Sequence, residues 1–200
     1  MSSEVVDEEI LNIYELLLRD NEPEVRSEAV AKVPIMARYC TGSLLIEKVI
    51  PIIKEQLASD ASQHVKGSMA QSICDLAESL SKEDTIAHIL PPVTAIMKDS
   101  ATEVRVSLMQ NLSKLALKIG EEDVEKLVLP EIMNLSKDNT WRVRLATIEF
   151  LPQVPEFISE RLFHEKIEPL LLSFLEDPVH SVRVEAVNCM IKLKNKSFNL

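Results

Sequence analysis

The chain has 200 residues, 46% of them hydrophobic, which is enough apolar material for a core and excludes a wholly disordered chain. It holds three glycines, about a fifth of average usage, too few for the tight turns of a sheet-rich fold, so we expect an all-α protein. Lys plus Arg total 22 against 32 Asp plus Glu, and this net charge of −10 argues against a nucleic-acid partner.

The beginning of the chain carries acidic groups and no basic segment before an apolar stretch, unlike a secretory signal peptide. No apolar run approaches the roughly 18 residues of a membrane span, so we expect no membrane partner. Cys40, Cys74 and Cys189 lie on apolar stripes outside any CxxC pattern, and we expect them to be buried, reduced thiols. Together these features predict a cytoplasmic protein, with a nuclear pool left open.

One motif recurs along the whole chain: Asp, four residues, Val, then Arg or Lys, at steps of 40, 39, 39 and 39 residues. It reads Asp20/Val25/Arg26, Asp60/Val65/Lys66, Asp99/Val104/Arg105, Asp138/Val143/Arg144 and Asp177/Val182/Arg183. A fixed period of this length is the signature of a repeat protein. We therefore predict a single array over 1–200, with repeats at about 1–41, 42–80, 81–119, 120–157 and 158–197.

Each repeat contains two stretches with the apolar spacing of a helix. One precedes the Asp, as in the run Ile46–Leu57, and the other begins near the Val, with apolar residues five, eight and eleven positions further on. A helix pair of this size cannot bury both apolar stripes alone, so neighbours must stack. The prediction is an all-α solenoid of five helix pairs, each pair joined at its Asp.

Prolines occupy a second repeating column. Pro51, Pro91, Pro130 and Pro169 precede their aspartates by 9, 8, 8 and 8 residues, inside the first helices. Because proline removes a backbone donor and collides with the preceding turn, we expect these helices to be interrupted and bent there. Pro34 and Pro152 should likewise bend two of the second helices.

The recurring Asp and cation predict a structural ladder. The Asp can accept hydrogen bonds from amides at the start of the second helix, and the cation six residues later can pair with an aspartate of its own or the adjoining repeat. The ladder comprises Asp20, Arg26, Asp60, Lys66, Asp99, Arg105, Asp138, Arg144, Asp177 and Arg183. Its expected use is to fix the stacking register.

The short turn after each Asp is where function can vary, because stacking fixes the other columns. The turns read Asn21–Glu24, Ala61–His64, Ser100–Glu103, Asn139–Arg142 and Pro178–Ser181. The fourth holds the sole tryptophan, Trp141, followed by Arg142. Trp and Arg are enriched at interface hot spots, and we expect this pair to be exposed, with a core position for Trp141 as the alternative.

The helix pairs and the Pro, Asp, Val and Arg/Lys columns resemble HEAT repeats. Three stretches further resemble the scaffold (A) subunit family of protein phosphatase 2A, in its middle to late repeats: Asp60–Lys66, Lys82–Pro91 and Trp141–Pro152. The resemblance implies a protein without catalytic activity or cofactor that binds a phosphatase catalytic subunit. It implies Trp141, Arg142, Val179 and His180 as the contacts, with a regulatory subunit near residues 21–24 as a further candidate partner.

Two other classes of function fit the sequence less well. The chain has no glycine-rich phosphate loop and no HExxH, and its lone His164-Glu165 dipeptide does not make a metal site, so we expect no enzyme. A tubulin-binding TOG-like module or a transport receptor fragment is the alternative, because these also use Trp and Arg in such turns. The first and third turns carry glutamates, whereas TOG modules use basic loops to bind acidic tubulin, so this alternative is less favoured.

The last predicted helix keeps a full apolar stripe. Val182, Val187, Met190, Ile191 and Leu193 all fall on it, although terminal repeats normally carry a polar outer face. We therefore expect the chain to be a fragment or truncated form of an array whose next repeat covers this face, and we expect it to self-associate through the face.

Overall fold

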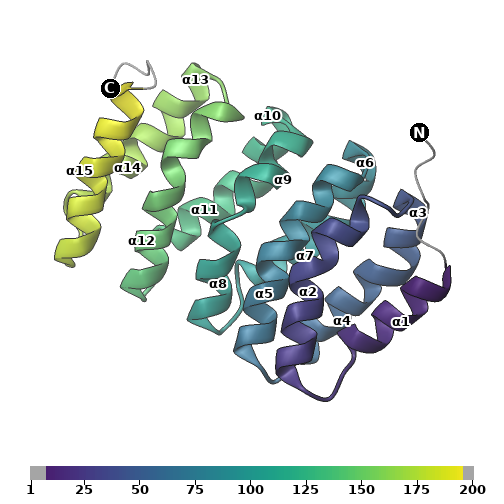
Figure 1. Cartoon of the computed structure of the whole chain (residues 1–200). Coiled ribbons are helices and arrows are strands. Elements are labelled where there is room, and N and C mark those ends of the chain that lie inside the picture. The colour runs from purple at the N-terminus through teal and green to yellow at the C-terminus, as the bar shows by residue number, and fades with distance from the viewer. Residues whose placement is uncertain (1–7, 196–200) are drawn as a thin grey trace. The chain divides into compact units, whose positions relative to one another are not determined.

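The computed structural model describes residues 8–195, and within that range the chain forms helices and turns and no strand. It divides into two compact units, Met1–Lys118 and Ile119–Leu200 (Figure 1). The all-α class predicted from the scarcity of glycine is confirmed. No helix among the described residues is long and apolar enough to cross a membrane.

Unit 1 contains three helix pairs. The first helices of its repeats are α1 (Glu8–Leu18), then α3 (Gly42–Leu44), η1 (Leu45–Val49) and α4 (Ile50–Ser59), then α6 (Lys82–Asp84), η3 (Thr85–Ile89) and α7 (Leu90–Ile96). The second helices are α2 (Pro23–Ala37), α5 (Gln63–Asp75) with η2 (Leu76–Ser79), and α8 (Thr102–Met109) with α9 (Leu112–Ile119). Within the unit, α2 packs on α5 and α5 packs on α8.

Unit 2 repeats the same plan. Its first helices are α10 (Glu121–Asp123), η4 (Val124–Val128) and α11 (Leu129–Leu135), then α13 (Glu160–Leu162), η6 (Phe163–Ile167) and α14 (Glu168–Phe174). Its second helices are α12 (Trp141–Phe150) with η5 (Leu151–Glu156), and α15 (His180–Asn195), which packs on α12. In both units the second helix begins two residues before the motif valine, as the periodicity predicts.

The core of each unit lies between stacked helix pairs. The motif valine is fully buried in repeats two to five, at Val65, Val104, Val143 and Val182, and half-buried at Val25. Five residues further on, Val30, Ala70 and Ile148 are also fully buried, because the next helix pair covers them. Burying a side chain of the size of valine stabilises by about 1.5–3 kcal/mol, so this column holds neighbouring repeats together.

The prolines of the first helices are accommodated by a π-helical turn. In each of the four helices the residue before the proline donates its amide to the carbonyl five residues earlier, as Leu90 does to Thr85 and Leu129 to Val124. Proline itself has no amide to donate, and it takes the second position of the α-helix that follows. The predicted interruption is therefore present, and its form is a wider turn.

The two prolines expected to bend second helices behave differently from one another. Helix α2 continues through Pro34 to Ala37, and the bend expected there stays a prediction. Helix α12 ends at Phe150, and Pro152 lies in the 3₁₀ segment η5. Helix α5 also passes into a 3₁₀ segment without any proline, so proline is not the cause common to these changes.

The three cysteines are not equivalent. Cys74 and Cys189 are fully buried, and burial raises the pKa of Cys189 to about 12, which keeps this thiol protonated at neutral pH. Cys40 is only half-buried, so the predicted burial is wrong at this position. Its Sγ lies 3.6 Å from the Sδ of Met36, in the turn after α2, where less of the core covers it.

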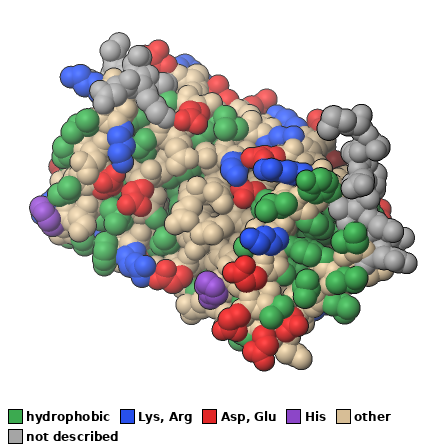
Figure 2. Space-filling model, in the orientation of Figure 1, with side chains coloured by type: hydrophobic (Ala, Val, Ile, Leu, Met, Phe, Trp, Pro, Cys, Tyr) green, Lys and Arg blue, Asp and Glu red, His purple; other side chains and the backbone are tan. Residues whose placement is uncertain are grey.

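Helices α15 and α1 each carry several exposed apolar side chains. On α15, Val182 and Leu193 are buried, whereas Val187 and Ile191 are 49% and 56% exposed. The expectation that a further repeat covers this face stays a prediction. Hydrophobic side chains also gather over α1 (Figure 2), where the exposed residues are Ile10, Ile13, Leu16 and Leu17.

One glycine is required by its backbone conformation. Gly120 precedes α10 with φ 83° and ψ 167°, a region that side chains disfavour at a cost of about 1–3 kcal/mol. We therefore expect Gly120→Ala to lower the free energy of unfolding by about that amount in urea denaturation. Gly42→Ala is the matched control: its added Cβ would lie 3.6 Å from the nearest atom, an ordinary contact, and should leave stability unchanged. Equal effects of the two substitutions would contradict this account.

Candidate binding surface

Each junction between repeats within a unit is tied by the motif aspartate of the later repeat. At the junction of the first two repeats, the guanidinium of Arg26 donates from Nε and Nη2 to the two carboxylate oxygens of Asp60, at 2.8 and 2.9 Å. Its Nη1 donates to the carbonyl oxygen of Asp20, at 2.7 Å. One side chain therefore binds the turn of its own repeat and the turn of the next.

The same arrangement joins the two repeats of unit 2. Arg144 donates to both carboxylate oxygens of Asp177, at 2.6 and 2.9 Å, and to the carbonyl oxygen of Asp138, at 2.7 Å. The side chains of Arg144 and Asp177 are 12% and 6% exposed. Paired hydrogen bonds to a charged partner in such a buried place are stronger than a surface ion pair.

The carboxylates also organise the turns. Oδ1 of each motif aspartate accepts the amide two residues later, at 2.8 Å in all five repeats, just before the second helix begins. In repeats one, three, four and five the motif arginine also donates to the carbonyl of the same aspartate, so both ends of these turns are fixed. The turn residues that follow are thus presented on a rigid base.

Hydrogen bonding from Arg144 holds the pKa of Asp177 below its ordinary value of 3.8. The amide of Val179 adds to this by donating to the same carboxylate, and burial opposes it. A carboxylate whose folded pKa is depressed contributes stability above its ordinary pKa and loses it as the pH falls through the folded value.

The fourth turn places its tryptophan on the surface. Trp141 is the first residue of α12 and is 41% exposed, and Arg142 beside it is exposed. In the turn immediately before them, Arg144 donates to the carbonyl of Asp138, and the amide of Thr140 donates to the carboxylate of Asp138. Trp141 is therefore a large, partly apolar side chain on a fixed support, and a core position is not what the structure shows.

The fifth turn carries the other two residues implied by the resemblance. His180 is the first residue of α15, the position equivalent to Trp141, and it is exposed. Since α12 packs on α15, the two residues begin neighbouring helices. Val179 is half-buried, and its amide donates to Asp177, so its backbone serves the turn itself.

The first turn differs from the fourth in charge. Glu22 and Glu24 are exposed, and acidic side chains gather at the loop between α1 and α2, at the lower edge of Figure 2. The regulatory-subunit contact expected near residues 21–24 would therefore have to accept an acidic surface.

No arrangement among the described residues suits a metal ion. The side chain of His164 has two carboxylate neighbours, Glu168 at 2.7 Å and Glu160 at 3.7 Å, one helical turn to either side. The hydrogen bond to Glu168 raises the pKa of His164, and both side chains of this helical pair are half-buried.

Stacked helix pairs, a π-helical turn before the recurring proline of the first helices, and a rung of Asp and Arg or Lys define an α-solenoid repeat protein. Residues 3–81 match the PPP2R1A-like HEAT repeat family model, and residues 80–199 match the PIK3R4-like, middle domain model. The second model covers more than half of the chain, so the chain belongs to the PIK3R4-like, middle domain family. The predicted HEAT-repeat solenoid fold is confirmed.

Curated relatives are regulatory subunits of a phosphatase. The chain is 37% identical over 106 residues to the beta isoform of the human 65 kDa regulatory (A) subunit of serine/threonine-protein phosphatase 2A, a match that covers 50% of this chain and 17% of that protein. The mouse protein of the same description is 44% identical over 57 residues, covering 28% of this chain and 9% of its own length. The resemblance to this subunit is confirmed, and the chain spans less than a fifth of the length of these relatives.

Solved structures share the fold over nearly the whole chain. The crystal structure of Cex1p has a TM-score of 0.76 at 16% identity and covers 97% of this chain and 38% of its own. A structure of microtubule polymerases with TOG domain arrays has a TM-score of 0.61 at 18% identity and covers 92% of this chain and 40% of its own. At such identities the likeness concerns the fold alone.

The depressed pKa of Asp177 predicts how stability depends on pH. We expect Asp177→Asn to be less stable than the unsubstituted protein at pH 7, with a difference that shrinks as the pH falls below 3.8, because the carboxylate then loses its charge. Urea denaturation between pH 2.5 and 7 measures this. Glu176→Gln, the same change at the exposed neighbour, is the control. A difference that stays constant with pH would show that the carboxylate charge adds no stability.

Proposed function

We propose that this chain is a non-catalytic scaffold that binds the catalytic subunit of a protein phosphatase 2A-type serine/threonine phosphatase through its intra-repeat turns. Trp141 and Arg142 form the centre of the contact, and Val179 and His180 of the next turn extend it. The observation that carries the proposal is the exposure of Trp141 on a turn fixed by Arg144 and Asp177. The similarity to the human regulatory (A) subunit supports the choice of partner.

The exposure of Trp141 and the ordered turn beneath it are the properties expected of a binding hot spot. A tryptophan that is 41% exposed can still bury much of its ring against a partner. Because the turn beneath it is already ordered, little backbone freedom is lost on binding, and this preorganisation favours affinity. The adjacent Arg142 supplies a cation at the edge of the same contact.

A regulatory subunit is a second proposed partner, at residues 21–24. The exposed Glu22 and Glu24 would require a basic surface on that subunit. Tubulin binding in the manner of TOG modules has only the shared fold in its support, and tubulin is therefore the comparison partner in the experiment.

Replacement of the tryptophan tests the proposal. We expect Trp141→Ala to weaken binding of a purified phosphatase catalytic subunit by about 2–4 kcal/mol, or roughly 30- to 1,000-fold in Kd, measured by calorimetry. Helical content by circular dichroism should not change, because the side chain lies outside the core. Arg142→Ala should cost less, and its loss should shrink at high salt, since screening weakens exposed charges.

Gln63 is the control residue, because it is exposed and begins α5 at the position equivalent to Trp141. Gln63→Ala should bind as the unsubstituted protein does. Unchanged affinity of Trp141→Ala would contradict the proposed contact, and so would binding to tubulin in place of the catalytic subunit.

A further inference from the structure

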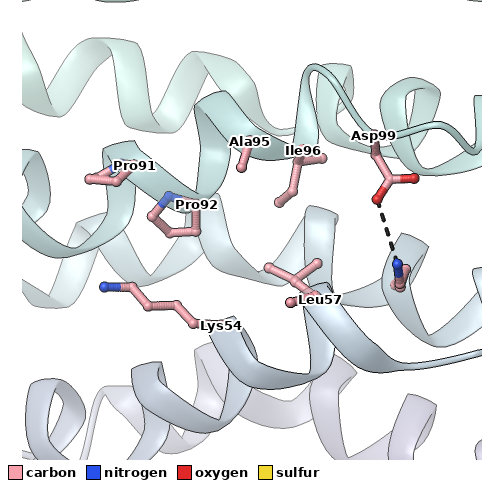
Figure 3. A pocket seen from close by; sticks show the side chains of 9 residues that line it. Lys54, Leu57, Pro91, Pro92, Ala95, Ile96 and Asp99 are labelled. Atoms are coloured by element: carbon pink, nitrogen blue, oxygen red, sulfur yellow. Dashed lines mark ion pairs between the residues drawn. The ribbon is translucent and has the colours of Figure 1, made fainter.

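A hollow of about 440 Å³ opens between the first helices of the second and third repeats, α4 and α7, within unit 1. Figure 3 shows Leu57 of α4 facing Pro92, Ala95 and Ile96 of α7, with Asp99 at one end and Lys54 toward the other. The volume lies in the range of about 300–1,000 Å³ that is typical of ligand pockets.

Comparison with the preceding junction explains why this one is open. In the second repeat the residue four before the motif aspartate is Gln56, which is buried and donates its side-chain amide to the carbonyl of Leu18 in the first repeat. The equivalent residue of the third repeat is Ala95, which is too short to reach across. The space that a glutamine fills at one junction is therefore empty at the next.

The cation of the rung at this junction also fills less space than its counterpart at the preceding junction. Lys66 is the only lysine in a column that is otherwise arginine, and its Nζ lies 3.6 Å from Oδ2 of Asp99. Arg26 at the preceding junction fills the equivalent place with a planar guanidinium bonded to both oxygens of Asp60. An ammonium group makes no such fork, so the end of the hollow is less filled.

Three features of the hollow specify a ligand. Leu57 and Ile96, 8% and 3% exposed, provide an apolar floor. Lys54 is half-buried at the rim, and no ion pair or hydrogen bond of its side chain is found among the described residues. Ala58 lines the hollow, and its carbonyl, equivalent to the one that Gln56 binds on Leu18, has no donor among the residues that the structure describes.

We propose that this hollow binds a short peptide segment of a partner protein that presents one phenylalanine- or leucine-sized side chain next to a carboxylate. The apolar side chain occupies the floor, the carboxylate pairs with Lys54, and a backbone N–H of the segment donates to the carbonyl of Ala58 in the place that Gln56 takes at the other junction. A peptide carries all three groups together. The hollow does not include Trp141, so this proposal and the proposed function are tested independently of one another.

The probe is the peptide acetyl-Glu-Glu-Phe-Glu-Glu-amide, titrated into isotope-labelled protein while amide shifts of residues 54–58 and 91–99 are followed. We expect saturable shifts in these residues with Kd of about 1 mM or below. A peptide with glutamine in place of each glutamate should bind at least about fivefold more weakly, because the contact with Lys54 loses its charge. 3-Phenylpropionate, which has no N–H, should bind more weakly than the acidic peptide.

Substitutions locate the site. Ala95→Gln should fill the hollow as Gln56 does, weaken the acidic peptide at least about tenfold and leave the protein folded. Lys54→Glu should weaken the acidic peptide and leave the glutamine peptide unchanged, whereas Lys137→Glu, the same change at an exposed lysine of unit 2, should affect neither. Absence of shifts at 5 mM peptide would overturn the proposal, as would undiminished binding to Ala95→Gln. Tighter binding of 3-phenylpropionate would overturn the peptide as the ligand.

Discussion

The hydrogen-bonded pair of an arginine with the aspartate of the next repeat is the interaction on which this architecture depends. Apolar stripes make helix pairs stack, but they are non-directional and would tolerate sliding by a helical turn. The guanidinium of Arg26 or Arg144 accepts one geometry, since it must reach two carboxylate oxygens of the next turn and a carbonyl of its own. Stacking therefore supplies the energy, and the rung supplies the register.

The same pair governs what the surface can present. Because the aspartate also accepts the amide two residues later, the second helix of each repeat with a motif arginine starts from a turn whose two ends are held. Residues at the helix start, such as Trp141 and His180, are then displayed in equivalent positions on neighbouring repeats. At the junction of the second and third repeats the motif cation is a lysine, and Ala95 stands at the position that Gln56 has in the preceding repeat. This junction opens into the hollow beside Lys54.

The scarcity of glycine was enough to predict the all-helical class. The period of 39 residues predicted the two helices of each repeat, the start of every second helix and the exposed turn position of Trp141, because stacking makes these properties the same in each repeat. The sequence did not reveal the π-helical turns, since proline predicts an interruption and not the hydrogen bonds that replace the lost one. A cap column, Thr41, Ser81 and Ser159, was also missed although it keeps the same period; each hydroxyl accepts the amide three residues later.

The hollow between α4 and α7 could not be predicted from the sequence, for a different reason. Gln56 and Ala95 occupy one column, but only the structure shows that the glutamine amide spans two repeats. The partial exposure of Cys40 and the continuation of α2 past Pro34 depend on where this helix ends. That end is decided by local packing and not by the period. Periodicity thus predicts what the repeats share, and the individual properties of a repeat come from the side chains that break its columns.

A double-mutant cycle on Arg26 and Asp60 tests the central claim most directly. Free energies of unfolding are measured for the unsubstituted protein, Arg26→Ala, Asp60→Ala and the double variant, so that contacts made by only one partner cancel. A paired and largely buried rung predicts a coupling energy of about 2 kcal/mol or more, well above the 0.2–1 kcal/mol of exposed pairs. Coupling below about 0.5 kcal/mol would show that apolar stacking alone sets the register, and the account given for the rung would be wrong.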